Sequence, residues 1–261
     1  MENTEDFLKV IQDKLILDFL KYLKENQIVQ AIDSISLDSN KAKFANEKIK
    51  NVKYFKNIAE TLYEYKLSIN GENFKGLGEI KPGVYEGGFK LWECEKDGVQ
   101  YVLENGFSGI FDNQEISNKN VLEIGCGSGL FGILCLVYGV NSVSFQDFNS
   151  EVLKLWTIPN LALNIETLQD RVAFIEGDWA DFNSKKLLDS GYLSFKEKIS
   201  RKYDLIFGSD VLYETRNYQN LIKLFQANLT ENGVVVISSK AYYYGNGGSI
   251  AEFKNYLDGS L

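Results

Sequence analysis

The stretch VLEIGCGSGLFG, residues 121–132, decides the fold, because an apolar run within it gives way to closely spaced glycines. The run predicts a buried β-strand, and the apolar residues after the glycines predict a helix. Glycine permits positive φ and lets a ligand approach the main chain, while the following helix offers free N–H groups. A plain turn would not need glycines at this density, so we interpret the loop as a ligand-binding loop.

The alternation of apolar strand and helix continues to residue 239. Predicted strands cover 119–124, 141–146, 171–176, 203–208 and 233–239. Predicted helices cover 129–138, 150–164, 184–200 and 216–229. Continuous apolar strands between helices predict a mostly parallel sheet covered on both faces, an α/β doubly wound fold. Ligands of such sheets bind at the carboxyl ends of the strands.

The first part of the chain differs from the rest. Residues 5–26 carry apolar side chains at four-residue steps, which predicts an amphipathic helix. We interpret residues 33–57 as a Ser-, Asn- and Lys-rich linker with marginal helix, and residues 61–69 as a short strand. The predicted organisation is an N-terminal helical extension and linker at 1–79, followed by the main domain at 80–261.

Composition limits the function. The 261 residues are 44% hydrophobic, enough for a large core, and the net charge of −8 favours a basic protein partner over direct nucleic-acid binding. We expect neither a signal peptide nor a membrane span. Three cysteines without histidine predict no disulfide framework and no metal site, and they suit a reducing compartment, the cytoplasm and/or the nucleus. We expect a monomer. The chain has no histidine to serve as a catalytic base.

Two cofactors compete for the glycine loop. Gly127, Gly129 and Gly132 match the GxGxxG dinucleotide fingerprint. The alternative frame, Glu123 followed by glycines at 125, 127 and 129, resembles motif I of the seven-strand S-adenosylmethionine-dependent methyltransferases. Asp147 lies where a carboxylate binds ribose hydroxyls in either case. Asp178 suits the adenine amino group and Trp179 the ring, and hydride transfer lacks a histidine, so we predict S-adenosyl-L-methionine.

Four further segments carry a more specific resemblance. They are PGVYEGGFKLWEC (82–94), FQDFNSEVLKLWTIPNLALN (145–164), GSDVLYE (208–214) and SSKAYYYGNGGS (238–249). From about residue 80 to 257 the chain resembles the protein-histidine N-methyltransferases, a branch of the methyltransferase-like enzymes with a Rossmann-like fold. The resemblance implies methylation of a histidine side-chain nitrogen in a large-subunit ribosomal protein. That fold normally adds two more strands as a C-terminal hairpin. Here only a helix near 249–257 is expected, which would leave the fifth strand at an exposed edge.

The resemblance also implies the site residues. The implied cofactor-binding residues are Trp92, Glu93, Gly125, Cys126, Gly127, Gln146, Asp147, Phe148, Gly177, Asp178, Trp179 and Ser209. The implied catalytic residues are Asp210 and Tyr213. The acceptor channel is assigned to Tyr85, Lys240, Tyr242 and the glycines 245, 247 and 248.

The chemistry fits this assignment. A neutral imidazole already has a lone pair for the methyl group, so the enzyme must mainly orient it. Asp210 would accept the far ring N–H, and Tyr213 would orient that carboxylate or flank the ring. A helix cap is the alternative role for Asp210.

Three other functions stay open at this point. They are a protein-lysine methyltransferase, a non-catalytic S-adenosylmethionine-binding module in ribosome assembly, and a nicotinamide oxidoreductase.

Overall fold

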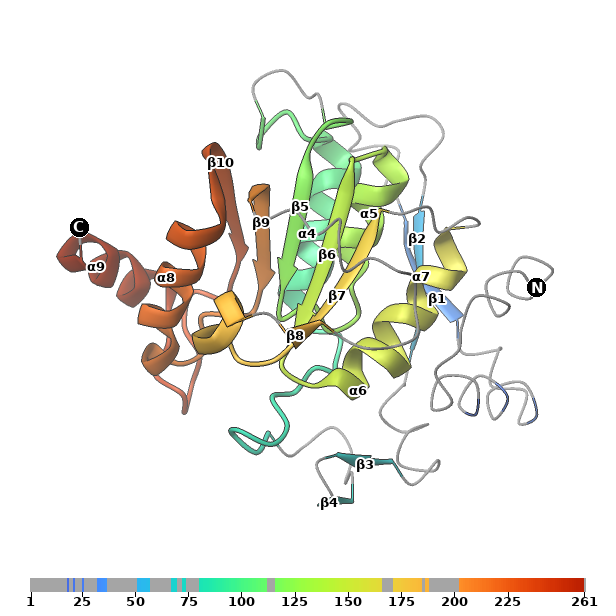
Figure 1. The fold of residues 1–261 in the computed structure, drawn as a ribbon, viewed down its shortest axis with the longest axis horizontal. Helices are drawn as coiled ribbons and strands as arrows, with labels where there is room; N and C mark the ends of the chain where they lie inside the picture. The colour runs from blue at the N-terminus through green and yellow to red at the C-terminus, as the bar shows by residue number, and fades with distance from the viewer. Residues whose placement is uncertain are drawn as a thin grey trace.

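A six-stranded sheet lies at the centre of the molecule (Figure 1). The computed structural model describes residues 18, 21, 25, 32–36, 51–56, 67–69, 72–73, 80–111, 116–165, 171–184, 186–187 and 202–260. The strands run in the order β10-β9-β5-β6-β7-β8. Their bounds are β5 Asn120–Ile124, β6 Ser142–Asp147, β7 Val172–Glu176, β8 Lys186–Leu187, β9 Tyr203–Ser209 and β10 Leu229–Ser238. All neighbours pair in parallel except β7 and β8, so the doubly wound α/β prediction is confirmed.

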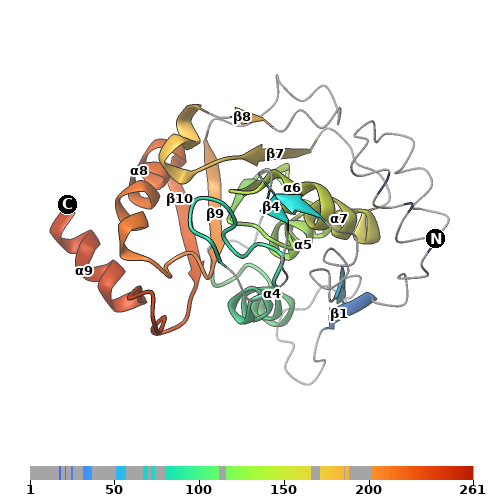
Figure 2. The ribbon, with the colours of Figure 1, turned by 90° about the horizontal axis from the view of Figure 1, so that it is seen from below.

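Helices cover both faces of the sheet (Figure 2). Their bounds are α4 Glu93–Asn105, α5 Leu130–Tyr138, α6 Ser150–Val152, α7 Ile158–Asn164, α8 Tyr218–Asn228 and α9 Ile250–Ser260. Successive strand residues point to opposite faces. Val121 of β5 belongs to the core beneath α4, α5 and α7. Leu122 and Ile124 belong to the core beneath α8 and α9. β5 is therefore apolar on both sides, whereas β6 places Val143 and Phe145 in the first core and Ser144 and Gln146 on its opposite face.

Two predicted helices differ from the structure. The helix expected over 150–164 is three pieces, because a π-helical turn at Leu153–Thr157 separates α6 from α7. The helix expected over 184–200 is wrong at Lys186–Leu187, which pair with β7 as a strand. A 3-10 turn at Trp179–Ser184 precedes them. Residues 185 and 188–200 lie outside the described residues.

The linker interpretation of residues 33–57 is wrong for the residues that the structure describes. β1 (Ile32–Ser36) and β2 (Asn51–Phe55) pair as antiparallel strands. Val52 and Tyr54 are buried in the main core. The side-chain amide of Asn164 in α7 accepts a hydrogen bond from the Lys53 N–H and donates one to its carbonyl, as a neighbouring strand would. The hairpin is therefore packed on the sheet domain.

Less of the remaining N-terminal part is described. Residues 18, 21 and 25 are helical, and the rest of the predicted helix over 5–26 lies outside the described residues. Of residues 61–69, the strand β3 covers Ser68–Ile69 and pairs with β4 at Glu72–Asn73. The domain boundary near residue 80 stays a prediction.

β10 forms one edge of the sheet, and none of its residues is fully buried. α9 follows it, near the helix expected over 249–257, and packs beside α8. Across the described segments, we find no helix with the length and apolar character that a membrane crossing requires.

Candidate functional site

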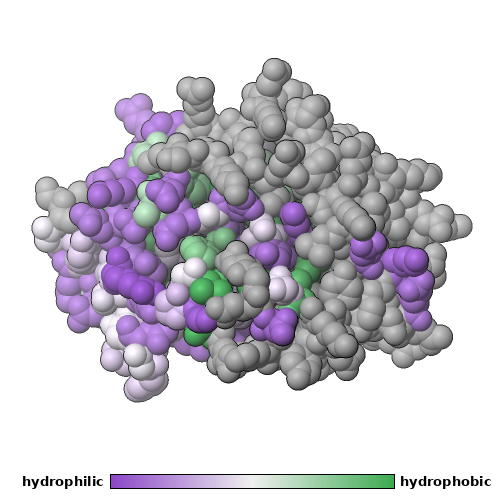
Figure 3. Space-filling view, turned by 60° about the horizontal axis from the view of Figure 1, so that its bottom comes forward, coloured by the Kyte–Doolittle hydropathy of each residue, from purple (hydrophilic) through white to green (hydrophobic). Residues whose placement is uncertain are grey.

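A cavity of about 700 Å³ opens at the carboxyl ends of the parallel strands. Its described walls include eleven of the predicted site residues: Trp92, Gly125, Gly127, Asp147, Phe148, Gly177, Asp178, Trp179, Ser209, Asp210 and Tyr213. Figure 3 shows this end of the molecule, where apolar residues are grouped near the centre of the described surface among polar ones. Asp147 and Trp179, predicted to hold the sugar and the purine, thus share one cavity.

Three predicted cofactor-binding residues do not line this cavity. The Glu93 side chain is 81% exposed and forms an ion pair with Lys240 at 3.1 Å. Cys126 is buried, and its Sγ lies 3.6 Å from the Thr157 hydroxyl. Gln146 supports the cavity from behind, because its side chain bonds to the Gly125 N–H, the Gly177 carbonyl and the Trp179 indole N–H.

The glycine loop has the conformation that its sequence predicts. Gly125, Gly127 and Gly129 all have positive φ, between +48° and +72°. A Cβ on Gly127 would lie 3.1 Å from the carbonyl of Gly88. Thr157 donates to the Gly127 carbonyl at 2.7 Å, and Asn160 donates to the Ser128 carbonyl at 2.9 Å. The π-helical turn therefore brings the TIPN string against the back of the loop, and the loop is fixed before a ligand binds.

Gly129→Ala should destabilise the fold by about 2–4 kcal/mol, combining a left-handed non-glycine residue with overpacking. Its Cβ would lie 2.6 Å from Thr157 Cγ2. Gly139→Ala is the matched control, because Gly139 also has positive φ but no heavy atom within 4 Å of the added carbon. Denaturant unfolding should show a clearly larger loss for Gly129→Ala. Equal losses would mean that contact with Thr157 contributes nothing.

Asp147 ends β6 and is buried beside the loop. Its carboxylate accepts the N–H groups of Gly127 and Asn149, each at 3.0 Å. Burial raises the pKa of this carboxyl from 3.8 to about 6, although these main-chain donors partly oppose the shift. A carboxylate has lone pairs for further donors, so Asp147 retains acceptor capacity toward the cavity that it lines.

Cofactor affinity should depend on pH through Asp147. Ribose hydroxyls would favour its ionised form, so affinity should be full above pH about 6 and fall as the pH drops through that value. Calorimetry with S-adenosylhomocysteine would measure this dependence. In Asp147→Asn that part of the dependence should disappear. An identical pH profile in both proteins would contradict the role of Asp147.

Two further carboxyls are buried around the loop. Glu95 of α4 lines the cavity and accepts hydrogen bonds from the Ser128 hydroxyl and from the N–H of Leu130 at the start of α5. Burial raises its pKa to about 7. Glu123 accepts the Gly132 N–H at 2.8 Å, and burial also raises its pKa. A positively charged ligand in the cavity would offset the cost of ionising these buried acids.

A segment before α4 covers part of the cavity. Residues 82–92 contribute Glu86, Gly87 and Trp92 to its lining. Tyr213 donates to Glu86 Oε2 at 2.7 Å, so this tyrosine of the GSDVLYE motif bonds to the segment before α4. The expected orientation of Asp210 by Tyr213 is therefore not what the structure contains. Burial, followed by the nearby Glu86 charge, raises the pKa of Tyr213, which keeps the hydroxyl protonated as a donor.

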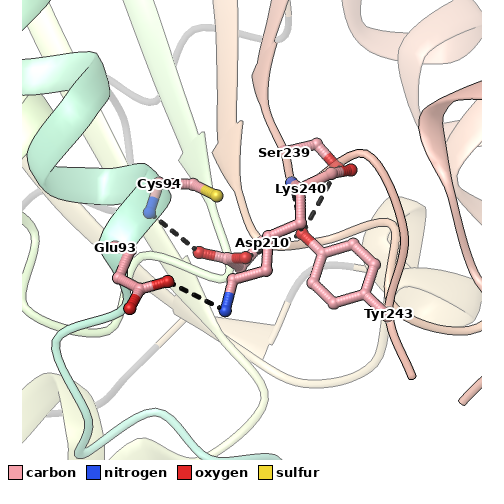
Figure 4. Close-up of polar contacts among 6 residues, drawn as sticks. All are labelled: Glu93, Cys94, Asp210, Ser239, Lys240 and Tyr243. Atoms are coloured by element: carbon pink, nitrogen blue, oxygen red, sulfur yellow. Dashed lines mark hydrogen bonds and ion pairs between the residues drawn. The ribbon is translucent and has the colours of Figure 1, made fainter. Parts of the chain in front are cut away.

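Asp210 lines the cavity and lies between Cys94 at the start of α4 and the loop after β10 (Figure 4). Its φ of +54° is the only positive value among the non-glycine residues that the structure describes. Its Oδ2 accepts the Cys94 N–H at 3.2 Å, and its Oδ1 accepts the Tyr243 hydroxyl at 2.7 Å. Strained backbone of this kind persists only where its surroundings fix it, and it is concentrated at active sites. The carboxylate is held in one orientation.

Sequence reasoning missed three residues that contribute here. Glu86 and Glu95 line the cavity, and Tyr243 both lines it and holds Asp210. Glu86 and Tyr243 belong to the YEGG and SKAYYYG motifs, so the sequence pointed to these two positions but did not indicate what their side chains do. Glu95 has no such signal.

The cavity fits S-adenosylmethionine on three observations. Its size is in the range of small-molecule sites. The tight glycine turn leaves main chain instead of side chains at the wall, and the surrounding carboxyls suit a sulfonium cation. Among the described residues, no group of three or more potential metal ligands is close enough to hold an ion.

Comparison with known proteins agrees with this geometry. A family model described as lysine methyltransferase matches residues 81–247. The chain belongs to this family. Membership decides the choice between cofactor frames in favour of the methyltransferase.

Individual relatives show which methyltransferases the chain is similar to. A histidine protein methyltransferase 1 homolog of Dictyostelium discoideum is 40% identical over 179 residues, covering 69% of this chain and 51% of that protein. The Bos taurus homolog is 33% identical over 214 residues, covering 73% and 53%. Histidine protein methyltransferase 1 of Schizosaccharomyces pombe is 28% identical over 217 residues, covering 70% and 60%. The resemblance stated from the motifs is thus confirmed, and the chain spans about half the length of the first two relatives.

Proposed function

We propose that this methyltransferase uses S-adenosylmethionine to methylate a histidine side-chain nitrogen of a protein, and that the substrate is a large-subunit ribosomal protein. The observation that carries the proposal is the fixed Asp210 carboxylate at the wall of the cavity. The names of the relatives support histidine as the acceptor. Three free, buried cysteines are compatible with a cytoplasmic and/or nuclear location.

The bound cofactor would supply an electrophilic methyl group on a sulfonium. Asp210 would accept the far N–H of the acceptor imidazole, which points the other nitrogen and its lone pair toward the cofactor side of the cavity. That nitrogen would take the methyl carbon as its bond to sulfur breaks, with S-adenosylhomocysteine as the leaving group. The ring would become cationic, and the Asp210 carboxylate would stabilise the positive charge. Solvent or Asp210 then takes the ring proton. The residues act mainly by orientation.

The two tyrosines at this site do not supply the base that a lysine acceptor would need, which leaves that role to a carboxylate. Burial raises the pKa of both Tyr213 and Tyr243, and each hydroxyl donates to a carboxylate. Neither tyrosine is therefore suited to deprotonate a lysine ammonium at neutral pH. A neutral imidazole needs no such base.

The proposed substrate can be tested with isolated large ribosomal subunits. They are incubated with the chain and methyl-labelled S-adenosylmethionine. We expect label in one protein of the large subunit and none in small subunits, which serve as the control. Mass spectrometry should place the methyl group on a histidine, and its change to alanine should abolish labelling. Binding of the cofactor without label in any protein would favour a non-catalytic module.

A further inference from the structure

Of the three consecutive tyrosines after β10, one side chain is buried and two are exposed. Tyr243 is buried, and its hydroxyl bonds to Asp210. Tyr242 is 48% exposed and Tyr244 is 92% exposed, and their rings meet edge to face with centroids 5.1 Å apart. The same short segment therefore fixes the proposed catalytic carboxylate from within and presents two aromatic rings outside.

Exposed apolar side chains are concentrated around the cavity. In the described part of the chain, five large apolar side chains are exposed: Ile80, Tyr101, Tyr242, Tyr244 and Tyr256. Three of the five, Ile80, Tyr242 and Tyr244, line the cavity. Scattered exposed apolar residues need no explanation, but a group at the rim of a cavity indicates a binding surface.

Three side-chain amides also line this cavity. Asn217 directly precedes α8, Asn220 lies in its first turn, and Asn246 comes from the loop that holds the tyrosines. Within the described segments, none of these three side chains has a hydrogen-bond partner that would occupy its amide. An amide offers both donors and acceptors, which matches the N–H and C=O groups of an extended peptide.

Two basic side chains of the cavity wall are held by acidic neighbours, and a third, Lys90, lies over the Trp92 ring with its Nζ 4.2 Å from the ring centroid. Lys240 pairs with Glu93 at 3.1 Å, and Arg216 pairs with Glu214. With these two basic side chains held, the tyrosines and asparagines supply aromatic contact and neutral hydrogen bonds for recognition. Tyrosine, asparagine, glycine and serine are also the residues of antibody binding loops, where tyrosine gives rigid contact area and small polar residues adapt their hydrogen bonds.

The loop is attached firmly to the site. The Gly248 N–H donates to the Tyr213 carbonyl at 3.1 Å, and Gly247 bridges to Glu214. A Cβ on Gly248 would lie 2.0 Å from the Leu212 carbonyl oxygen, so the loop and the segment after Asp210 are in close contact. A ligand on the outer tyrosines would thus lie at a fixed position relative to Asp210.

We propose that residues 240–248, the tyrosine loop, together with Asn217 and Asn220, bind the extended segment of the protein substrate that carries the acceptor side chain. The inference rests on the proposed function and adds the surface and the kind of partner. Tyr242 and Tyr244 contact the substrate segment, and the asparagine amides bind its main chain. Tyr243 is a positioning residue that acts through Asp210.

Each tyrosine then has its own kinetic signature. Tyr242→Ala and Tyr244→Ala should each raise KM for the protein acceptor about tenfold, the scale of an aromatic contact residue, with kcat and cofactor affinity unchanged. Tyr243→Phe should lower kcat about tenfold with KM nearly unchanged, because Asp210 loses a donor. Tyr101→Ala is the matched control, since Tyr101 is 45% exposed but does not line the cavity.

The experiment has two arms. In the first, a phage-displayed library of short random peptides is selected on the immobilised chain with S-adenosylhomocysteine present, and enriched peptides are measured against each variant. In the second, methyl transfer to isolated large ribosomal subunits gives kcat and KM. Thermal unfolding of every variant verifies that its fold is kept.

The expected result is peptide binding that Tyr244→Ala weakens about tenfold and Tyr101→Ala leaves unchanged, with the KM and kcat split described above. Failure to enrich peptides, or equal binding and KM in wild type and Tyr244→Ala, would overturn the inference. Tyrosine-dependent peptide binding without methyl transfer would instead remove the proposed function and leave the docking surface standing.

Discussion

Replacing Asp210 by asparagine should lower kcat for methyl transfer by about two to three orders of magnitude, the effect of removing one preorganised polar group at a reacting centre. Asparagine tolerates the left-handed backbone of this position, so the fold should be kept. It has a single acceptor oxygen, however, where Asp210 uses two to bind Cys94 and Tyr243. The amide NH2 would therefore face one of these two donors, and the neutral side chain would not stabilise the imidazolium charge.

Steady-state kinetics with a methylated-histidine readout would measure this loss, and calorimetry would show whether cofactor affinity is unchanged. Asp181→Asn serves as the control, because Asp181 is exposed and does not line the cavity. Full activity of Asp210→Asn would remove Asp210 from the mechanism.

Asp147→Ala should have the second largest effect, on binding of the cofactor. We expect the binding free energy of S-adenosylmethionine to weaken by about 1–3 kcal/mol, because a buried polar group loses its partner. The dissociation constant would rise roughly 5- to 150-fold. Two effects contribute. The ribose hydroxyls lose their acceptor, and the Gly127 and Asn149 N–H groups lose theirs, which loosens the glycine loop.

Isothermal calorimetry on the purified variant tests this prediction, with circular dichroism to verify folding. An affinity equal to that of the wild-type chain would show that Asp147 binds only the main chain and not the sugar.

The sheet was predictable because buried parallel strands carry apolar side chains on both faces. Val121 and Leu122 point into different cores, and each is buried. The hairpin of β1 and β2 was missed because Ser, Asn and Lys dominate its surroundings. Its alternating Val52 and Tyr54 were the only sign of a half-buried strand.

The site was predictable where its residues follow strand ends, because parallel strands bring those positions to one edge. Gly125, Asp147, Asp178 and Asp210 all line the cavity for this reason. The hydrogen-bond partners of these side chains were harder to predict from the sequence. Asp210 bonds to Tyr243, 33 residues away, and Tyr213 bonds to Glu86, 127 residues away. Local spacing suggested a Tyr213–Asp210 contact, but only the tertiary arrangement decides which tyrosine reaches which carboxylate.

The amino acid that receives the methyl group can be identified directly. The chain would be incubated with methyl-labelled S-adenosylmethionine and a total protein extract, the labelled protein hydrolysed to amino acids, and the labelled amino acid separated by chromatography. We expect the label in methylhistidine, and we expect Asp210→Asn to abolish nearly all of it. Label found only in methyllysine, or no labelled protein despite bound cofactor, would show that the chain is not a protein-histidine methyltransferase.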